Sequence, residues 1–197
     1  MLFDLPTTES AIQTTTTAQN PKISPIDAIL EDVFGTIKQG HDYPFATGAL
    51  WSTHELMAYI LRQIGPAHIV FSTWSIATSA CDRLISMQSS GEILSISALV
   101  DWRVQVRTPG VLTLAKHAFS NIRVSSCHAK AFVMQNDNWN ISIVGSANLT
   151  NNPRIECGHM STSKTVADFH KSWIIAEINN SKPFGMDMRK AKHDGRT

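Results

Sequence analysis

A histidine and a lysine, His128 and Lys130, stand two residues apart at the start of an apolar run. On a β-strand, side chains two positions apart leave the same face, so the imidazole and the ammonium group would lie side by side. Both groups can donate hydrogen bonds to an anion, and a neutral imidazole can also attack phosphorus as a nucleophile. The pair therefore predicts a site for the chemistry of a phosphate ester.

A turn signal divides the sequence after this pair into two apolar runs. Asn136–Asn138 has strong turn chemistry, so we expect the runs 128–135 and 139–144 to pair as an antiparallel hairpin. Such a hairpin would bring the end of its second strand back beside His128 and Lys130.

Two neutral donors and one carboxylate follow the hairpin. Gly145 ends the second strand, where a glycine lets the backbone turn and approach a ligand closely. Ser146 and Asn148 then supply hydrogen-bond donors, and the carboxylate of Glu156 could orient an imidazole. We therefore predict five catalytic residues: His128, Lys130, Ser146, Asn148 and Glu156.

The spacing of apolar residues predicts the helices and strands that hold these five residues in place. Helical spacing predicts helices over 27–39, 53–64, 76–88, 111–119 and 165–178. Short apolar runs predict strands over 68–74, 93–100 and 122–125, then the hairpin, then 155–161. Strands that alternate with helices indicate an α/β layered domain, and the hairpin makes its sheet mixed.

The proposed site resembles the signature of the phospholipase D superfamily, which is H-x-K followed by a second strand ending in G-S-x-N. Here the two parts are His128-Ala-Lys130 and the GSAN run at 145–148. The resemblance implies a phospholipase-D-like layered fold, a mixed β-sheet with helices on both faces. One position departs from the family pattern: Gln135 stands where the family carries an aspartate, and Asp137 comes two residues later.

The same resemblance implies a metal-independent phosphodiesterase without a cofactor. Members of the superfamily use two histidines on one phosphodiester: one forms a phosphohistidine, and the other serves as acid and then as base. Among the eight histidines of this chain, only His128 is followed by x-Lys, so one chain supplies half of a site. The small single-motif bacterial endonucleases of the superfamily pair two copies, which implies a homodimeric nuclease here.

Three further residues are candidates for substrate binding. Trp74 follows Ser72 at the carboxyl end of a predicted strand, where open α/β sheets bind ligands and where an indole could stack on a base. Arg154 could contact a phosphate. A zinc site is not predicted, because the spacing of Cys127, Cys157 and the neighbouring histidines fits no standard ligand pattern.

Two other functions compete with the nuclease. A phospholipase or phosphatidyltransferase would share the chemistry, but such relatives carry two motifs in a longer chain. A degenerate member could bind nucleic acid without cutting it, and the Gln135 departure would suit that alternative.

Composition sets the remaining expectations. The 197 residues are 43% hydrophobic, enough for one core, and the net charge of +1 gives no global nucleic-acid footprint. We expect a flexible arm at 1–25, one domain at 26–184 and a flexible basic tail at 185–197. The three cysteines, the absence of a basic n-region and the short apolar runs predict a cytoplasmic protein without stable membrane insertion.

Overall fold

The computed structural model describes residues 25–151 and 153–181. The predicted arm at 1–25, except for its last residue, and the predicted tail at 185–197 lie outside the described residues. The helices are α1 (Pro25–Phe34), α2 (Thr53–Ile64), α3 (Thr78–Ser89), α4 (Val104–Arg107), α5 (Pro109–Ala118) and α6 (Lys164–Asn180). The strands are β1 (Asp42–Ala46), β2 (Ala67–Thr73), β3 (Ile93–Asp101), β4 (Asn121–Ser125), β5 (Ala131–Gln135), β6 (Asn140–Gly145) and β7 (Cys157–Ser161).

These strands form one mixed sheet in the order β1-β7-β6-β5-β2-β3-β4. Strands β2, β3 and β4 are parallel, and the remaining pairs are antiparallel. The predicted hairpin is confirmed as β5 and β6, with the Asn136 side chain accepting the backbone N–H groups of Asn138 and Trp139 in the turn. The carboxyl ends of the parallel strands therefore lie at the same end of the sheet as the start of β5.

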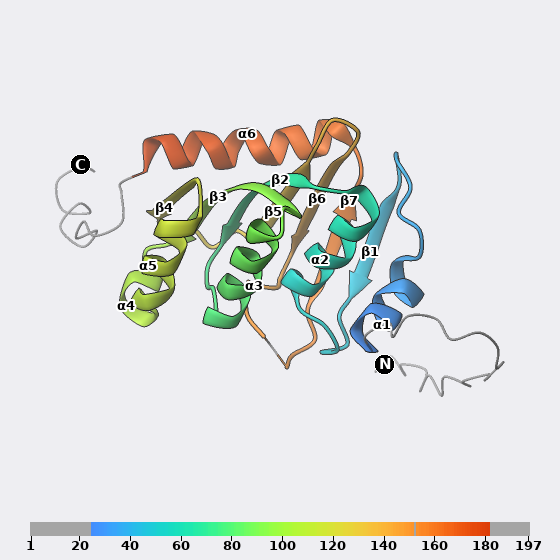
Figure 1. The fold of residues 1–197 in the computed structure, drawn as a ribbon, viewed down its shortest axis with the longest axis horizontal. Helices are drawn as coiled ribbons and strands as arrows, with labels where there is room; N and C mark the ends of the chain where they lie inside the picture. Colours follow the sequence, from blue (N-terminus) through green and yellow to red (C-terminus); the bar gives the residue numbers. More distant parts are fainter. Residues whose placement is uncertain (1–24, 152, 182–197) are drawn as a thin grey trace, which may run out of the picture.

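Helices cover both faces of the sheet, as expected (Figure 1). Helix α6 packs on one face through Ala167, Ile174 and Ile178. Helices α1, α2, α3 and α5 pack on the other face and share the larger core. Among the described residues, none of these helices has both the length and the apolar character to cross a bilayer.

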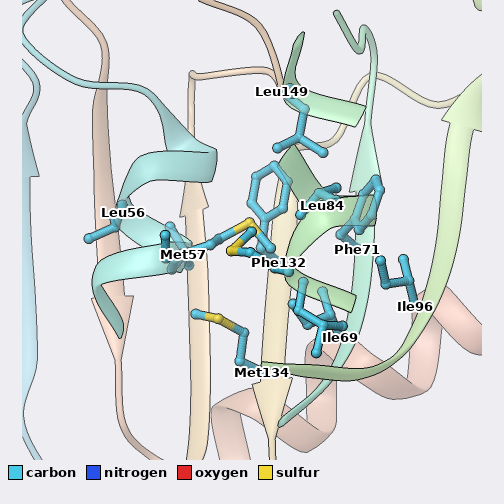
Figure 2. Close-up of a cluster of buried hydrophobic side chains, with 14 of the residues drawn as sticks. Leu56, Met57, Ile69, Phe71, Leu84, Ile96, Phe132, Met134 and Leu149 are labelled. Carbon is cyan, nitrogen blue, oxygen red and sulfur yellow. The ribbon is translucent and has the colours of Figure 1, made fainter. Parts of the chain in front are cut away.

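The centre of the larger core lies beneath the segment that carries the G-S-x-N motif (Figure 2). Phe71 of β2 stacks on Phe132 of β5, with ring centroids 5.8 Å apart. Leu149, the residue after Asn148, is fully buried and points into the same cluster. Burying a leucine side chain contributes about 1.5–3 kcal/mol, so Leu149 anchors the motif loop to the core.

The N-terminal part of the domain differs most from the expectation. The first helix ends at Phe34 rather than at residue 39, because Gly35 has a φ of +54°, which turns the backbone out of the helix. A strand follows that the sequence did not suggest, β1, which contains Pro44. Proline is tolerated there because β1 is the edge strand of the sheet and pairs only with β7.

Candidate active site

The His-x-Lys pair lies in an extended segment just before β5, not within the strand as predicted. The two side chains are nevertheless together: Lys130 Nζ lies 3.3 Å from Nδ1 and 3.4 Å from Nε2 of His128. The ammonium group also donates to the backbone carbonyl of His128 at 2.7 Å. His128 is exposed and Lys130 is 7% exposed, so the imidazole is presented to solvent beside a lysine whose side chain is largely buried.

Burial sets the electrostatics of Lys130. Desolvation lowers the pKa of this ammonium group, and the charges of Cys127 and Glu156 act in the opposite direction. A buried cation gains most from an anion that reaches it directly. Lys130 is therefore suited to hold a phosphoryl oxygen beside His128.

The buried carboxylate of Asp101 fixes the segment that carries His128. Asp101 is 2% exposed and accepts the backbone N–H groups of Cys127 at 3.2 Å and of Arg103 at 3.0 Å. A carboxylate that accepts backbone N–H groups makes strong, charge-assisted hydrogen bonds. Sequence reasoning gave Asp101 no such part, because β4 and α5 separate it from His128 along the chain.

Ser146 is held beside the start of β7 by Glu156. The Ser146 hydroxyl donates to the Glu156 carboxylate, and Ser146 Oγ accepts the N–H group of Cys157 at 3.1 Å. The Glu156 carboxylate therefore accepts a hydrogen bond from Ser146, whereas the sequence suggested an imidazole as its partner. Gly145 permits this close approach, since a Cβ atom there would lie 2.6 Å from the carbonyl oxygen of Cys157.

The carboxyl end of β2 contacts both parts of the signature. Thr73 Oγ1 lies 3.4 Å from Oδ1 of Asn148, which leaves the amide NH₂ group as the donor end of that side chain. Next to it, the Trp74 ring lies 5.6 Å from the His128 ring, measured between centroids. The end of β2 therefore brings Asn148 and His128 to one place.

The other two predicted binding residues do not line the surface beside His128: Ser72 lies under it, paired with Ala131, and Arg154 is in a separate loop. Ser72 is fully buried, so its hydroxyl is not presented to a substrate in this conformation. Arg154 is exposed in the loop between β6 and β7. Trp74 and Arg154 therefore remain candidate contacts for a substrate, and Ser72 does not.

A surface pocket of about 460 Å³ opens beside the His-x-Lys pair. Its size is typical of ligand sites. Ser146 and the end of β6 form one wall, and α6 contributes His170 and Trp173. Sequence reasoning missed both α6 residues, because nothing in the local pattern tells which turn of α6 lies over the site.

His170 has the features of a neutral donor in this pocket. Burial lowers its pKa, so the uncharged imidazole is favoured. Trp173 Nε1 donates to His170 Nδ1 at 3.2 Å, which places the remaining proton on Nε2. Across residues 25–151 and 153–181, no group of three or more His, Cys, Asp or Glu side chains is arranged to hold a metal ion.

Gln135 occupies the far end of β5, five residues and roughly 16 Å along the strand from Lys130. Its amide nitrogen donates to Asn140 Oδ1 at 2.8 Å and to Asp168 Oδ1 of α6 at 3.0 Å. The position of the family aspartate thus links the hairpin to α6 and does not touch the imidazole.

Replacing Gln135 by aspartate, the family residue, is expected to lower the melting temperature by a few degrees without raising activity. The new carboxylate would face Asp168, whose own pKa is lowered by hydrogen bonds from Lys164 and Gln135. Stability from this contact is present above the ordinary carboxyl pKa and is lost as the pH falls through the lowered value. Thermal melts at pH 7 and at acidic pH would measure this effect.

The double variant Gln135→Asp with Asp168→Asn serves as the control. It removes the facing charge, so it should recover most of the lost melting temperature. If Gln135→Asp alone melted like the parent and cut substrate faster, the conclusion that Gln135 only links the hairpin to α6 would be wrong.

No protein-family model matches the sequence, and no curated protein matches it significantly. Solved structures do share its architecture. Nuc from Salmonella typhimurium, a phospholipase D family member, aligns over 72% of this chain and 97% of its own, with a TM-score of 0.53 and 14% identity. NucT from Helicobacter pylori aligns over 72% and 96%, with a TM-score of 0.55 and 12% identity.

A third neighbour is an archaeal chromatin protein described as showing a novel mode of DNA binding. It aligns over 79% of this chain and 60% of its own, with a TM-score of 0.50 and 11% identity. At these identities the likeness concerns the fold. The seven-stranded mixed sheet with helices on both faces is the fold that this chain shares with these solved structures.

Proposed function

We propose that this protein is a metal-independent phosphodiesterase that cleaves nucleic acid through a phosphohistidine on His128, at a site completed by a second copy of the chain. One observation carries the proposal: the exposed His128 imidazole lies 3.3 Å from the buried Lys130 ammonium group, at a pocket that also includes Ser146. A nucleophile and a phosphate-binding cation are thus gathered at one surface, beside the Ser146 hydroxyl.

In the first step, an imidazole nitrogen of His128 bonds to phosphorus while the P–O bond to the leaving group breaks. A second imidazole, from the other copy, gives its proton to the leaving oxygen. In the second step, that imidazole takes a proton from water, the hydroxide attacks phosphorus, and the P–N bond breaks. Lys130 and the amide NH₂ group of Asn148 stabilise the charge on the non-bridging oxygens, and Glu156 holds the Ser146 side chain beside them.

Homodimerisation follows from the proton balance. Both steps need a second acid–base group on the side of the phosphate away from His128, and the sequence has only one His-x-Lys. The exposed position of His128 is compatible with a facing copy across a twofold axis. This arrangement gives one site for each pair of chains.

Cleavage assays in excess EDTA test the proposal. Labelled single-stranded DNA, duplex DNA and RNA should be cut in EDTA, with a denaturation-resistant, acid-labile adduct on His128 visible by mass spectrometry after a rapid quench. Cleavage that requires an added divalent ion, without the adduct, would contradict the mechanism. Release of a head group from phosphatidylcholine vesicles with every nucleic acid left intact would assign the lipid chemistry instead.

Binding without cleavage is the second candidate function. It is favoured by the fold similarity to the archaeal chromatin protein and by the glutamine at the family aspartate position. Tight nucleic-acid binding with no adduct and no cleavage under any condition would establish it.

A further inference from the structure

The ring of Trp74 is the first of a row of aromatic and cationic side chains that leads away from His128. Its centroid lies 5.6 Å from that of the His128 ring. The guanidinium carbon of Arg107 lies 4.7 Å from the Trp74 centroid. Arg107 is exposed and Trp74 is partly exposed, so both can be reached from solvent.

The row continues along the segment after β3. The guanidinium carbon of Arg103 lies 5.5 Å from the centroid of Trp102. Together with Arg107 and Val106, these residues line a second surface pocket of about 240 Å³. Val106 is 62% exposed, which places an apolar side chain at the rim between the two arginines. We call this row the aromatic track; it consists of Trp74, Trp102, Arg103, Val106 and Arg107.

The same buried carboxylate holds the aromatic track and the catalytic segment. Asp101 accepts the N–H group of Arg103 with one oxygen and that of Cys127, next to His128, with the other. The position of α4 relative to the imidazole is therefore fixed by hydrogen bonds to one side chain. A site in which the binding surface and the reacting group share a rigid support is a pre-organised one.

The indole nitrogen of Trp74 also suggests that this residue does more than pack in the core. Its indole Nε1 is buried and has no hydrogen-bond partner among the described residues. An unsatisfied buried donor is costly, and such donors in native structures call for a functional explanation. The position of Trp74 brings its ring close to both the His128 imidazole and the Arg107 guanidinium group.

We propose that the aromatic track binds a single-stranded segment of nucleic acid and leads its phosphodiester to His128. Indole rings stack on bases of any sequence, and arginines beside them pair with the backbone phosphates. Only an unpaired strand can offer its base faces to Trp74 and Trp102, because a duplex keeps them stacked inside. This inference rests on the proposed function and adds to it the strand state of the substrate and the surface that selects it.

Binding is measured with His128→Ala as the parent, so that no probe is cut. The probes are a fluorescently labelled deoxythymidine strand of about 15 nucleotides and a blunt duplex of the same length. Trp102→Ala should weaken binding of the strand by about tenfold or more, since stacking on one ring accounts for roughly that loss, and should change duplex binding little. Trp102→Phe, which keeps a ring, should retain most of the affinity.

Arginine variants test the charges of the track. Arg107→Gln should weaken binding of the strand and reduce the slope of log affinity against log salt by about one unit or slightly less. Arg83→Gln, which changes an exposed arginine of α3, is the matched control and should leave both quantities unchanged. If Trp102→Ala fails to fold, the Arg107 variant still tests whether the aromatic track binds the strand.

Equal binding of the strand by the parent, Trp102→Phe, Arg107→Gln and any folded Trp102→Ala variant would overturn the track. Equal weakening for strand and duplex would overturn the preference for unpaired bases. Both results are distinguishable from failure of the proposed function, which appears as an absence of cleavage by the wild-type protein in EDTA whatever the track binds.

Discussion

His128→Ala protein should have lost nuclease activity in EDTA by at least about 10³-fold, while it folds like the wild type. The substitution removes the nucleophile, and no other group in the segment can form the same P–N bond. Because His128 is exposed, its loss should change the free energy of unfolding by no more than about 0.5 kcal/mol. Single-turnover cleavage and thermal melts measure the two quantities.

His117→Ala provides the matched control. This histidine is exposed on α5, on the far side of the sheet from the α6 pocket, and its replacement should leave cleavage unchanged. Cleavage by His128→Ala within tenfold of the wild-type rate would show that another group attacks phosphorus.

Lys130→Met should lower the cleavage rate by about 10²–10³-fold, the usual effect of removing one pre-organised donor from a developing charge. The same change should cost the fold little, because it replaces a largely buried cation by an apolar side chain of similar length. We expect a melting temperature at pH 7 equal to that of the wild type or higher. Cleavage would then be lost without a loss of stability.

The stability difference between the wild type and Lys130→Met should also depend on pH in a definite direction. Burial lowers the pKa of Lys130 in the folded protein, so the unfolded chain binds this proton more tightly. The wild type should therefore gain stability relative to Lys130→Met as the pH rises through the lowered pKa towards the ordinary lysine value. Lys116→Met, at an exposed position of α5, is the matched control. Lys130→Met that melts far below the wild type and still cuts substrate would mean that Lys130 is a structural residue.

The sequence predicted the part of the site that is built by neighbouring residues. His128, Lys130 and Ser146 meet because a hairpin with a recognisable turn joins them, and hairpin geometry is local. The glycine at position 145 also indicated a close backbone approach, and the structure shows that Cys157 leaves no room there for a side chain. Most helices and strands were likewise evident from apolar spacing.

Long-range packing decided what the sequence did not indicate. The rotation of α6 that brings His170 and Trp173 to the pocket depends on how Ala167 and Ile174 fit the sheet, which no local pattern specifies. The contact between Asp101 and Cys127 depends on the parallel pairing of β3 with β4. Strand β1 has only five residues and contains Pro44, and a proline in a short run argues against a strand when the sequence is read alone.

The central claim, that two copies of the His128 half-site make one active site, is tested by mixing subunits. Wild-type and His128→Ala chains are unfolded together, refolded at a constant total concentration, and assayed for cleavage in EDTA. If both imidazoles are required, activity follows the square of the wild-type fraction and falls to about one quarter in an equal mixture. A linear dependence, with about one half of the activity remaining, would mean that each chain holds a complete site and would contradict this account.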